Sequence, residues 1–167
     1  RKGNESGSVL VVGQDWYPLH QSIHNPLTIQ SPDSEPKKGY AETFALITES
    51  NYFPLFINLI PGLRSDPEVT SKNGAFSKYH CIQYLEAVVK AVKPKIIVTW
   101  GRDVFDRLNN NYGPFQPAFD IGSGGHEVAI QDHLSTWVPM FHPSHSGWYR
   151  DENKHQIETL KGLLSTS

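Results

Sequence analysis

The segment VLVVGQD at residues 9–15 decides the fold, because a run of apolar residues ends abruptly in a glycine and two polar side chains. A short continuous apolar run with a turn signal at its end is typical of a strand buried on both faces of a parallel sheet. Ligands of open α/β sheets bind outside the carboxyl ends of the strands, so the ends of such strands are expected to form one site. Three more runs end in the same way: residues 55–57 at Asn58, residues 96–99 at Trp100-Gly101, and residues 137–141 at His142-Pro143-Ser144.

Helical patterns lie between these strands, where parallel strands require crossover connections. The clearest is an amphipathic helix at residues 76–91 that Lys93-Pro94 would end, with an apolar stripe of Tyr79, Ile82, Leu85 and Val89. A last helix is expected at residues 151–164, with Ile157, Leu160 and Leu164 facing the sheet. Weaker helices are predicted at residues 41–47 and at residues 102–108, the second ended by the asparagines at 109–111, and long loops at residues 27–38 and 112–125.

Composition sets bounds on the kind of protein. The 167 residues, 38% of them hydrophobic, predict a single domain over 1–167 that buries about two thirds of its unfolded surface. The net charge of −2 means that any contact with DNA must come from a local basic patch. The single cysteine, Cys81, excludes a disulfide framework within the chain and a four-cysteine iron–sulfur cluster. No run approaches the roughly 18 apolar residues of a membrane span, so we expect a cytoplasmic monomer without a membrane part.

Three motifs resemble, in sequence order, those of the uracil-DNA glycosylase superfamily: GQDWYP at residues 13–18, IN at 57–58 and HPS at 142–144. The family's first motif reads GQDPYH, its middle strand ends in Asn, and its last motif is HPS. Taken alone, Asp15 and Ser144 could be helix N-caps and Asn58 could bridge a loop. The combination at successive strand ends favours the family, over residues 9 to about 164.

The resemblance implies a three-layer α/β/α sandwich with a central, mainly parallel four-stranded sheet. It also implies a monofunctional DNA glycosylase that flips out a pyrimidine nucleotide and hydrolyses its N-glycosidic bond, with no metal or other cofactor. Breaking this bond builds positive charge on the sugar and negative charge on the leaving base. By resemblance, Asp15 orients the attacking water and stabilises the sugar cation, while His142 donates a hydrogen bond to O2 of the base.

The base-binding and DNA-binding residues are also expected from the resemblance. Tyr17 would crowd the C5 position of the base, and Asn58 would pair with N3–H and O4 of uracil. The family's wedge leucine falls near Ser146, so Trp148 or Tyr149 could stack in the gap that the flipped base leaves. The full base-binding set is Gln14, Trp16, Tyr17, Ile29 and Asn58, and the DNA-binding set is Ser144, Ser146, Trp148, Arg150 and Lys154.

The identity of the base stays open at this point. The sequence has Trp16 where the uracil-specific enzymes have Pro, Pro18 where they have His, and Ile29 close to their stacking Phe. An Asn amide has a donor and an acceptor end, so a flipped Asn58 would match cytosine. The base is therefore uracil or a C5-modified pyrimidine, for example a hypermodified phage cytosine, which would give the protein an anti-phage role. The alternative is an inactive DNA- or protein-binding module, against which the presence of both Asp15 and His142 argues.

Other kinds of site fit less well. His20 with His24, and His142 with His145, have spacings that a helical zinc site could use, but prolines at 18, 26 and 143 and the absence of HExxH argue against it. The glycine-rich residues 122–125 lack the GK[ST] of a phosphate-binding loop. A triad of Ser144, His142 and Asp15 lacks the GxSxG turn of hydrolases.

Overall fold

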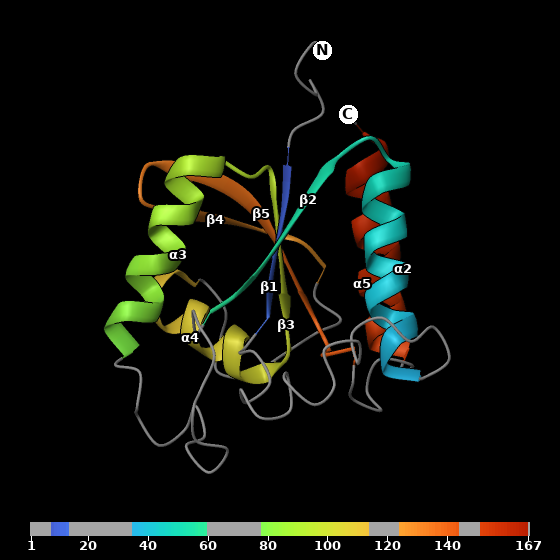
Figure 1. Cartoon of the computed structure of the whole chain (residues 1–167), viewed down its shortest axis with the longest axis horizontal. Helices are drawn as coiled ribbons and strands as arrows, with labels where there is room; N and C mark the ends of the chain where they lie inside the picture. The colour runs from blue at the N-terminus through green and yellow to red at the C-terminus, as the bar shows by residue number, and fades with distance from the viewer. Residues whose placement is uncertain (1–7, 14–34, 60–77, 114–123, 144–150, 167) are drawn as a thin grey trace, which may run out of the picture.

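The computed structural model describes residues 8–13, 35–59, 78–113, 124–143 and 151–166. Helices α3 and α4 cover one face of a central sheet, and α2 and α5 cover the other (Figure 1). The elements in chain order are β1 (Ser8–Gly13), α2 (Glu35–Glu49), β2 (Phe53–Asn58), α3 (Lys78–Val92), β3 (Ile96–Trp100), α4 (Arg102–Tyr112), β4 (His126–Ile130), β5 (His133–Met140) and α5 (Asp151–Ser165). The expected α/β/α architecture is confirmed.

Within the described residues the sheet has five strands in the order β2-β1-β3-β5-β4, of which only β4 is antiparallel to its neighbour. The prediction of a four-stranded sheet was wrong, because it lacked the edge strand β4. Only Val128 and Ile130 of β4 are buried, and the apolar run in its sequence HEVAI is only the three residues 128–130 long. A half-buried edge strand carries a weaker sequence signal than a strand buried on both faces.

Two helices are longer than predicted. Helix α2 begins at Glu35, inside the region 27–38 that was predicted as a loop. Helix α4 continues through the three asparagines to Tyr112, because Leu108 and Tyr112 pack on the core and Asn111 donates to the Arg107 carbonyl at 2.7 Å. The predicted end at 109–111 and the loop start at 112 were therefore wrong, since tertiary packing outweighs the weak helix propensity of Asn.

A hydrogen bond between side chains joins the end of α4 to α3. The Tyr112 hydroxyl donates a hydrogen bond of 2.7 Å to the Glu86 carboxylate. Burial of the phenol, together with this hydrogen bond and the nearby negative charge, raises the pKa of Tyr112 well above its usual value. The phenol therefore stays a neutral donor throughout the physiological pH range.

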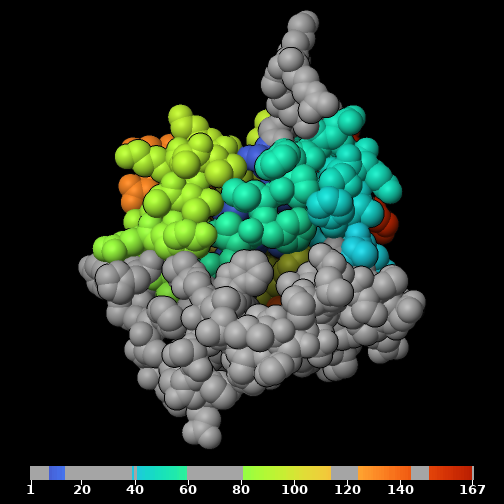
Figure 2. Space-filling view, in the orientation of Figure 1, coloured from blue at the N-terminus to red at the C-terminus, as the bar shows by residue number. Residues whose placement is uncertain are grey.

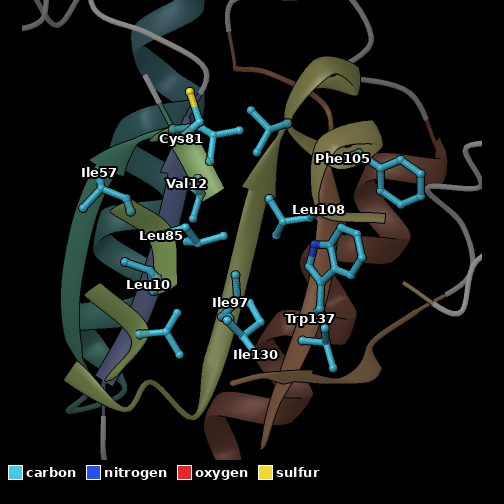
Figure 3. Close-up of a cluster of buried hydrophobic side chains, with 14 residues drawn as sticks. Leu10, Val12, Ile57, Cys81, Leu85, Ile97, Phe105, Leu108, Ile130 and Trp137 are labelled. Atoms are coloured by element: carbon cyan, nitrogen blue, oxygen red, sulfur yellow. The ribbon is translucent and has the colours of Figure 1, made fainter. Parts of the chain in front are cut away.

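The core has two halves, one on each face of the sheet. On the α3/α4 face, side chains from alternate strand positions pack against Leu85 of α3 and Phe105 of α4 (Figure 3). On the opposite face, Val9, Val11 and Val98 pack against Ile47 of α2 and Leu160 of α5. Every residue of β3 is buried, and so is every residue of β1 after Ser8. Both strands are thus the central, two-sided strands that their apolar runs predict.

The strand order places a topological switch point between β1 and β3. Strand β1 pairs with β2 on one side and with β3 on the other, and all three are parallel. The crossover helix after β1 lies on one face and the helix after β2 lies on the other (Figure 1). A reversal of this kind opens a crevice outside the carboxyl ends of the strands, here between β1 and β3.

A buried hydrogen bond between side chains joins β3 to β5. The indole Nε1 of Trp137 donates to the Thr99 hydroxyl at 2.8 Å, and both side chains have 0% exposure. We expect Thr99→Val, which keeps the shape and removes the acceptor, to lower the free energy of unfolding by about 1–3 kcal/mol. Thr48→Val, on the exposed face of α2, should change it by less than about 0.5 kcal/mol. Urea denaturation of both variants measures this, and equal losses would contradict it.

Candidate active site

The carboxyl ends of β1 and β2 meet at Gly13 and Asn58. These two residues are direct partners in the parallel ladder, which continues with the Leu59 N–H donating to the Gly13 carbonyl at 2.8 Å. The Asn58 side chain lies over Gly13, since a Cβ atom at position 13 would be 2.5 Å from Asn58 Oδ1. A side chain at position 13 would therefore displace the Asn58 amide. Asn58 thus lies over the end of β1. The next residues of the chain after this strand end are Gln14 and Asp15.

The carboxyl ends of β3 and β5 meet in the same way at Trp100-Gly101 and His142. The Gly101 N–H donates to the Met140 carbonyl at 2.9 Å, and Gly101 has a φ of +89° that favours glycine. The His142 ring meets the Trp100 ring edge-on, with centroids 6.4 Å apart and an interplanar angle of 74°. His142 is half-buried, whereas Trp100 is buried.

A row of aromatic rings connects the two ends of this site. Phe56, two residues before Asn58, has its ring centroid 5.7 Å from that of Trp100, although β1 lies between their strands. Phe44 of α2 stacks on Phe56 at 6.2 Å. The row Phe44, Phe56, Trp100 and His142 thus crosses the sheet on the α2/α5 face. Phe44 and Phe56 are 51% and 38% exposed, and β2 reaches the surface between α3 and α2 (Figure 2).

Two polar side chains of α5 also reach this end of the sheet, and the sequence analysis did not single them out. Asn153 and Gln156 are both 0% exposed and hydrogen-bond to backbone next to His142. Their signal in the sequence is slight: they stand on the helix face of Leu160 and Leu164, where the pattern predicts apolar residues. A polar residue on a core-facing stripe is the feature that could have found them.

The exposed cations near this end are held in surface ion pairs. Lys154 contacts Asp151 at 2.9 Å, and Arg102, the first residue of α4, contacts Asp106 at 3.4 Å. The hydrogen bond from Lys154, with its positive charge, lowers the pKa of Asp151 below its usual value. Exposed pairs of this kind are weak, so both cations can exchange their partners for a phosphate.

Several predicted site residues lie outside the described residues, and their placement stays a prediction. The structure describes Asn58, His142 and Lys154 from the predicted set. Asn58 and His142 come from strand ends that the sheet holds on one edge, and Lys154 lies in the first turn of α5. The residues outside are Gln14, Asp15, Trp16, Tyr17, Ile29, Ser144, Ser146, Trp148 and Arg150.

The described residues contain no group of three or more His, Cys, Asp or Glu side chains that could hold a metal ion. Among the helices that the structure describes, none is both long and apolar enough to cross a membrane.

The fold defines an α/β protein with a mainly parallel sheet, a class whose ligands bind outside the carboxyl ends of the strands. Residues 45–164 match the family model of the uracil DNA glycosylase superfamily. The chain therefore belongs to this superfamily, whose members are generally DNA glycosylases. The match includes Asn58 and His142 and begins after the first motif at 13–18. No curated relative matches the chain.

The contact of Gly13 with Asn58 yields a test of the site. Gly13→Ala would place a Cβ atom 2.5 Å from Asn58 Oδ1, so the amide, at the end of a flexible side chain, should swing away with little loss of stability. We expect base excision to fall by about 10-fold, the cost of about one misplaced hydrogen-bonding group.

Two comparisons control this test. Gly162→Ala lies in α5 with nothing within 4 Å of the new Cβ, and it should leave excision unchanged. In an Asn58→Ala background the Gly13→Ala change should have no further effect, because the clash is gone. A full loss in that background would show that Gly13 acts independently of Asn58.

Proposed function

We propose that this protein is a monofunctional DNA glycosylase, which extrudes a pyrimidine nucleotide, hydrolyses its N-glycosidic bond and leaves an abasic site. The observation that supports it most is the pairing of strand ends at one edge of the sheet. Asn58 lies over Gly13, from which the chain continues into Gln14 and Asp15, and His142 meets the adjacent Trp100. The family match over residues 45–164 supports the same reaction.

The proposed chemistry separates charge at two ends of the scissile bond. Water adds its oxygen to C1′ of the deoxyribose, the electron pair of the C1′–N1 bond leaves with the base, and the water proton passes to the Asp15 carboxylate. The carboxylate also stabilises the cationic sugar, and His142 donates a hydrogen bond to O2 of the departing base. Fixed charges and donors of this kind stabilise the transition state more than the ground state.

The state of the His142 imidazole matters for this role. A neutral ring with one protonated nitrogen suffices to donate the hydrogen bond, provided that the ring is held in place. The edge-on contact with Trp100 supports such a fixed orientation. The close packing of His142 against Gly101 supports it too, since a Cβ atom added at position 101 would lie 3.5 Å from His142 Cβ.

We propose that the base is uracil or a pyrimidine with a C5 substituent, and that Asn58 reads its polar edge. The Asn58 side chain is limited on the β1 side by Gly13, which supports a defined amide orientation. Trp16, Pro18 and Ile29 replace residues of the uracil-specific pocket, which supports a reshaped space around C5. Excision of a hypermodified phage cytosine would make the enzyme part of a defence against phage.

The DNA backbone is proposed to cross the same edge of the sheet. With a net charge of −2, binding must rely on local cations. Lys154 is 64% exposed and would exchange Asp151 for a phosphate, with Arg150 and the hydroxyls of Ser144 and Ser146 as further proposed contacts. Trp148 is the proposed stacking residue for the gap in the duplex.

The two catalytic assignments are tested together. Asp15→Asn should reduce excision by about 10²-fold or more while DNA binding is kept, because it removes a charge needed in the transition state and little volume. His142→Ala should lower kcat by about 10²-fold with a small change in KM. Single-turnover assays on duplex DNA measure both.

Matched variants control these assays. Asp132→Asn lies in the turn between β4 and β5, and His155→Ala is exposed on α5; both should be as active as the natural protein. Unchanged turnover in Asp15→Asn would overturn its assignment. A loss in His142→Ala that lies wholly in KM would make His142 a binding residue.

The choice of base is tested with duplexes that carry uracil, thymine, 5-hydroxymethylcytosine or its glucosylated form. We expect alkali-labile abasic sites with uracil or with a C5-modified cytosine, and none with thymine. If Trp16 and Ile29 adapt the pocket to a large base, Trp16→Pro with Ile29→Phe should shift preference toward uracil by about 10-fold, as a change in an apolar wall allows. Tight binding without release from any duplex would instead identify an inactive binding module.

A further inference from the structure

The backbone that leads into His142 is held by side chains of α5 on one side and by β3 on the other. On the β3 side, the Met140 carbonyl accepts the Gly101 N–H at 2.9 Å. On the other side, the Phe141 N–H donates to Asn153 Oδ1 at 3.0 Å, and the Pro139 carbonyl accepts Gln156 Nε2 at 2.9 Å. The backbone of residues 139 to 141, directly before His142, is thus hydrogen-bonded alternately to α5 and to the end of β3.

The side-chain amides of Asn153 and Gln156 bond to backbone groups of β5 and of the residue that follows it, as a neighbouring strand would. Strand β4 pairs with β5 only as far as the partners His126 and Trp137, so within the described part of the chain the last residues of β5 have no neighbouring strand on that side. Successive residues of a strand direct their backbone groups to alternate sides, which leaves those of Pro139 and Phe141 facing α5. Pro139 has no N–H to satisfy, and the two amides take up the remaining carbonyl and N–H.

Gln156 also ties this strand end to the start of β4. Its Oε1 accepts the Gly124 N–H at 3.0 Å, and its Nε2 donates to the Gly124 carbonyl at 3.1 Å as well as to Pro139. Both Nε2 hydrogens and one acceptor are used, so a flipped amide would set its oxygen against two carbonyls. The orientation of Gln156 is thereby fixed, at 0% exposure.

We propose that Asn153 and Gln156 are positioning residues for His142, an inference that rests on the proposed function. They act through the backbone of Phe141 and Pro139 and set the position from which the imidazole reaches the base. An apolar residue at either position would leave a buried backbone group unpaired, and the strand end would move to find a partner. Neutral amides satisfy these groups without adding a charge beside the imidazole.

The test uses variants that keep shape and remove hydrogen bonds: Asn153→Leu and Gln156→Met. We expect each to lower kcat by about 10-fold with KM within about twofold, because a small displacement of a catalytic group mainly affects the transition state. His155→Ala, exposed on the same helix, is the control and should keep full activity. If one variant fails to fold, the other tests the inference, since each removes a separate bond to the same strand end.

Two readouts separate positioning from a general loss of stability. In protein labelled with ¹⁵N-histidine, the His142 ring signals, assigned by comparison with His142→Ala, should shift in both variants and stay unchanged in His155→Ala. In a His142→Ala background, Asn153→Leu should cause no further loss of kcat, since coupled residues are not additive. Unchanged ring signals, or an equal loss of kcat in both backgrounds, would overturn the inference. If the natural protein releases no base from any of the duplexes, the proposed function fails, while the ring signals still report whether the two amides position His142.

Discussion

The parallel pairing of β1 with both β2 and β3 is the constraint on which the candidate site depends. It sets Gly13 opposite Asn58 and Val12 opposite Thr99, so the ends of three strands reach the same edge of the sheet. A shift of one residue in β2 would turn Asn58 from the α2/α5 face to the α3/α4 face and expose Ile57 in its place. The burial of Ile57 in the core on the α3/α4 face opposes that shift, because the half-buried polar Asn58 would take its place.

The same edge of the sheet is completed by polar rather than apolar packing. The pairing of β4 with β5 stops at His126 and Trp137. Beyond it, the side chains of Asn153 and Gln156 hydrogen-bond to the backbone at the end of β5 and directly after it. A fully paired strand would have bonded only the backbone, whereas amides on a helix also connect α5 to the Gly124 backbone. The region around His142 is therefore determined jointly by β3, β5 and α5, which suits a group whose position must be maintained within a fraction of an ångström.

Membership of the uracil DNA glycosylase superfamily relates this geometry to chemistry, and the residues around the base distinguish one member from another. The aromatic row runs from Phe44 through Phe56 and Trp100 to His142, and Asn58 lies two residues after Phe56 in the sequence. This row supplies an apolar surface at the carboxyl end of the sheet, on which hydrogen bonds to a base count for more than they do in water. In the proposed function, the departures at Trp16, Pro18 and Ile29 concern the recognition of the base and leave the proposed reaction unaltered.

The sequence by itself determined strands β1, β2 and β3 and the end of β5, the helices α3 and α5, and the family. Residues buried on both faces must be apolar throughout, and a core-facing helix must repeat every three to four residues, so both leave local patterns. Only the tertiary structure decided the rest. Strand β4 exists because β5 offers it a free edge, α4 passes its asparagines because Tyr112 reaches Glu86, and Asn58 leans over a residue 45 positions away because the register puts them side by side. Asn153 and Gln156 are polar because they bond backbone groups that come from other elements of the fold. Contacts of this kind join distant parts of the chain, and no periodicity in the sequence records them.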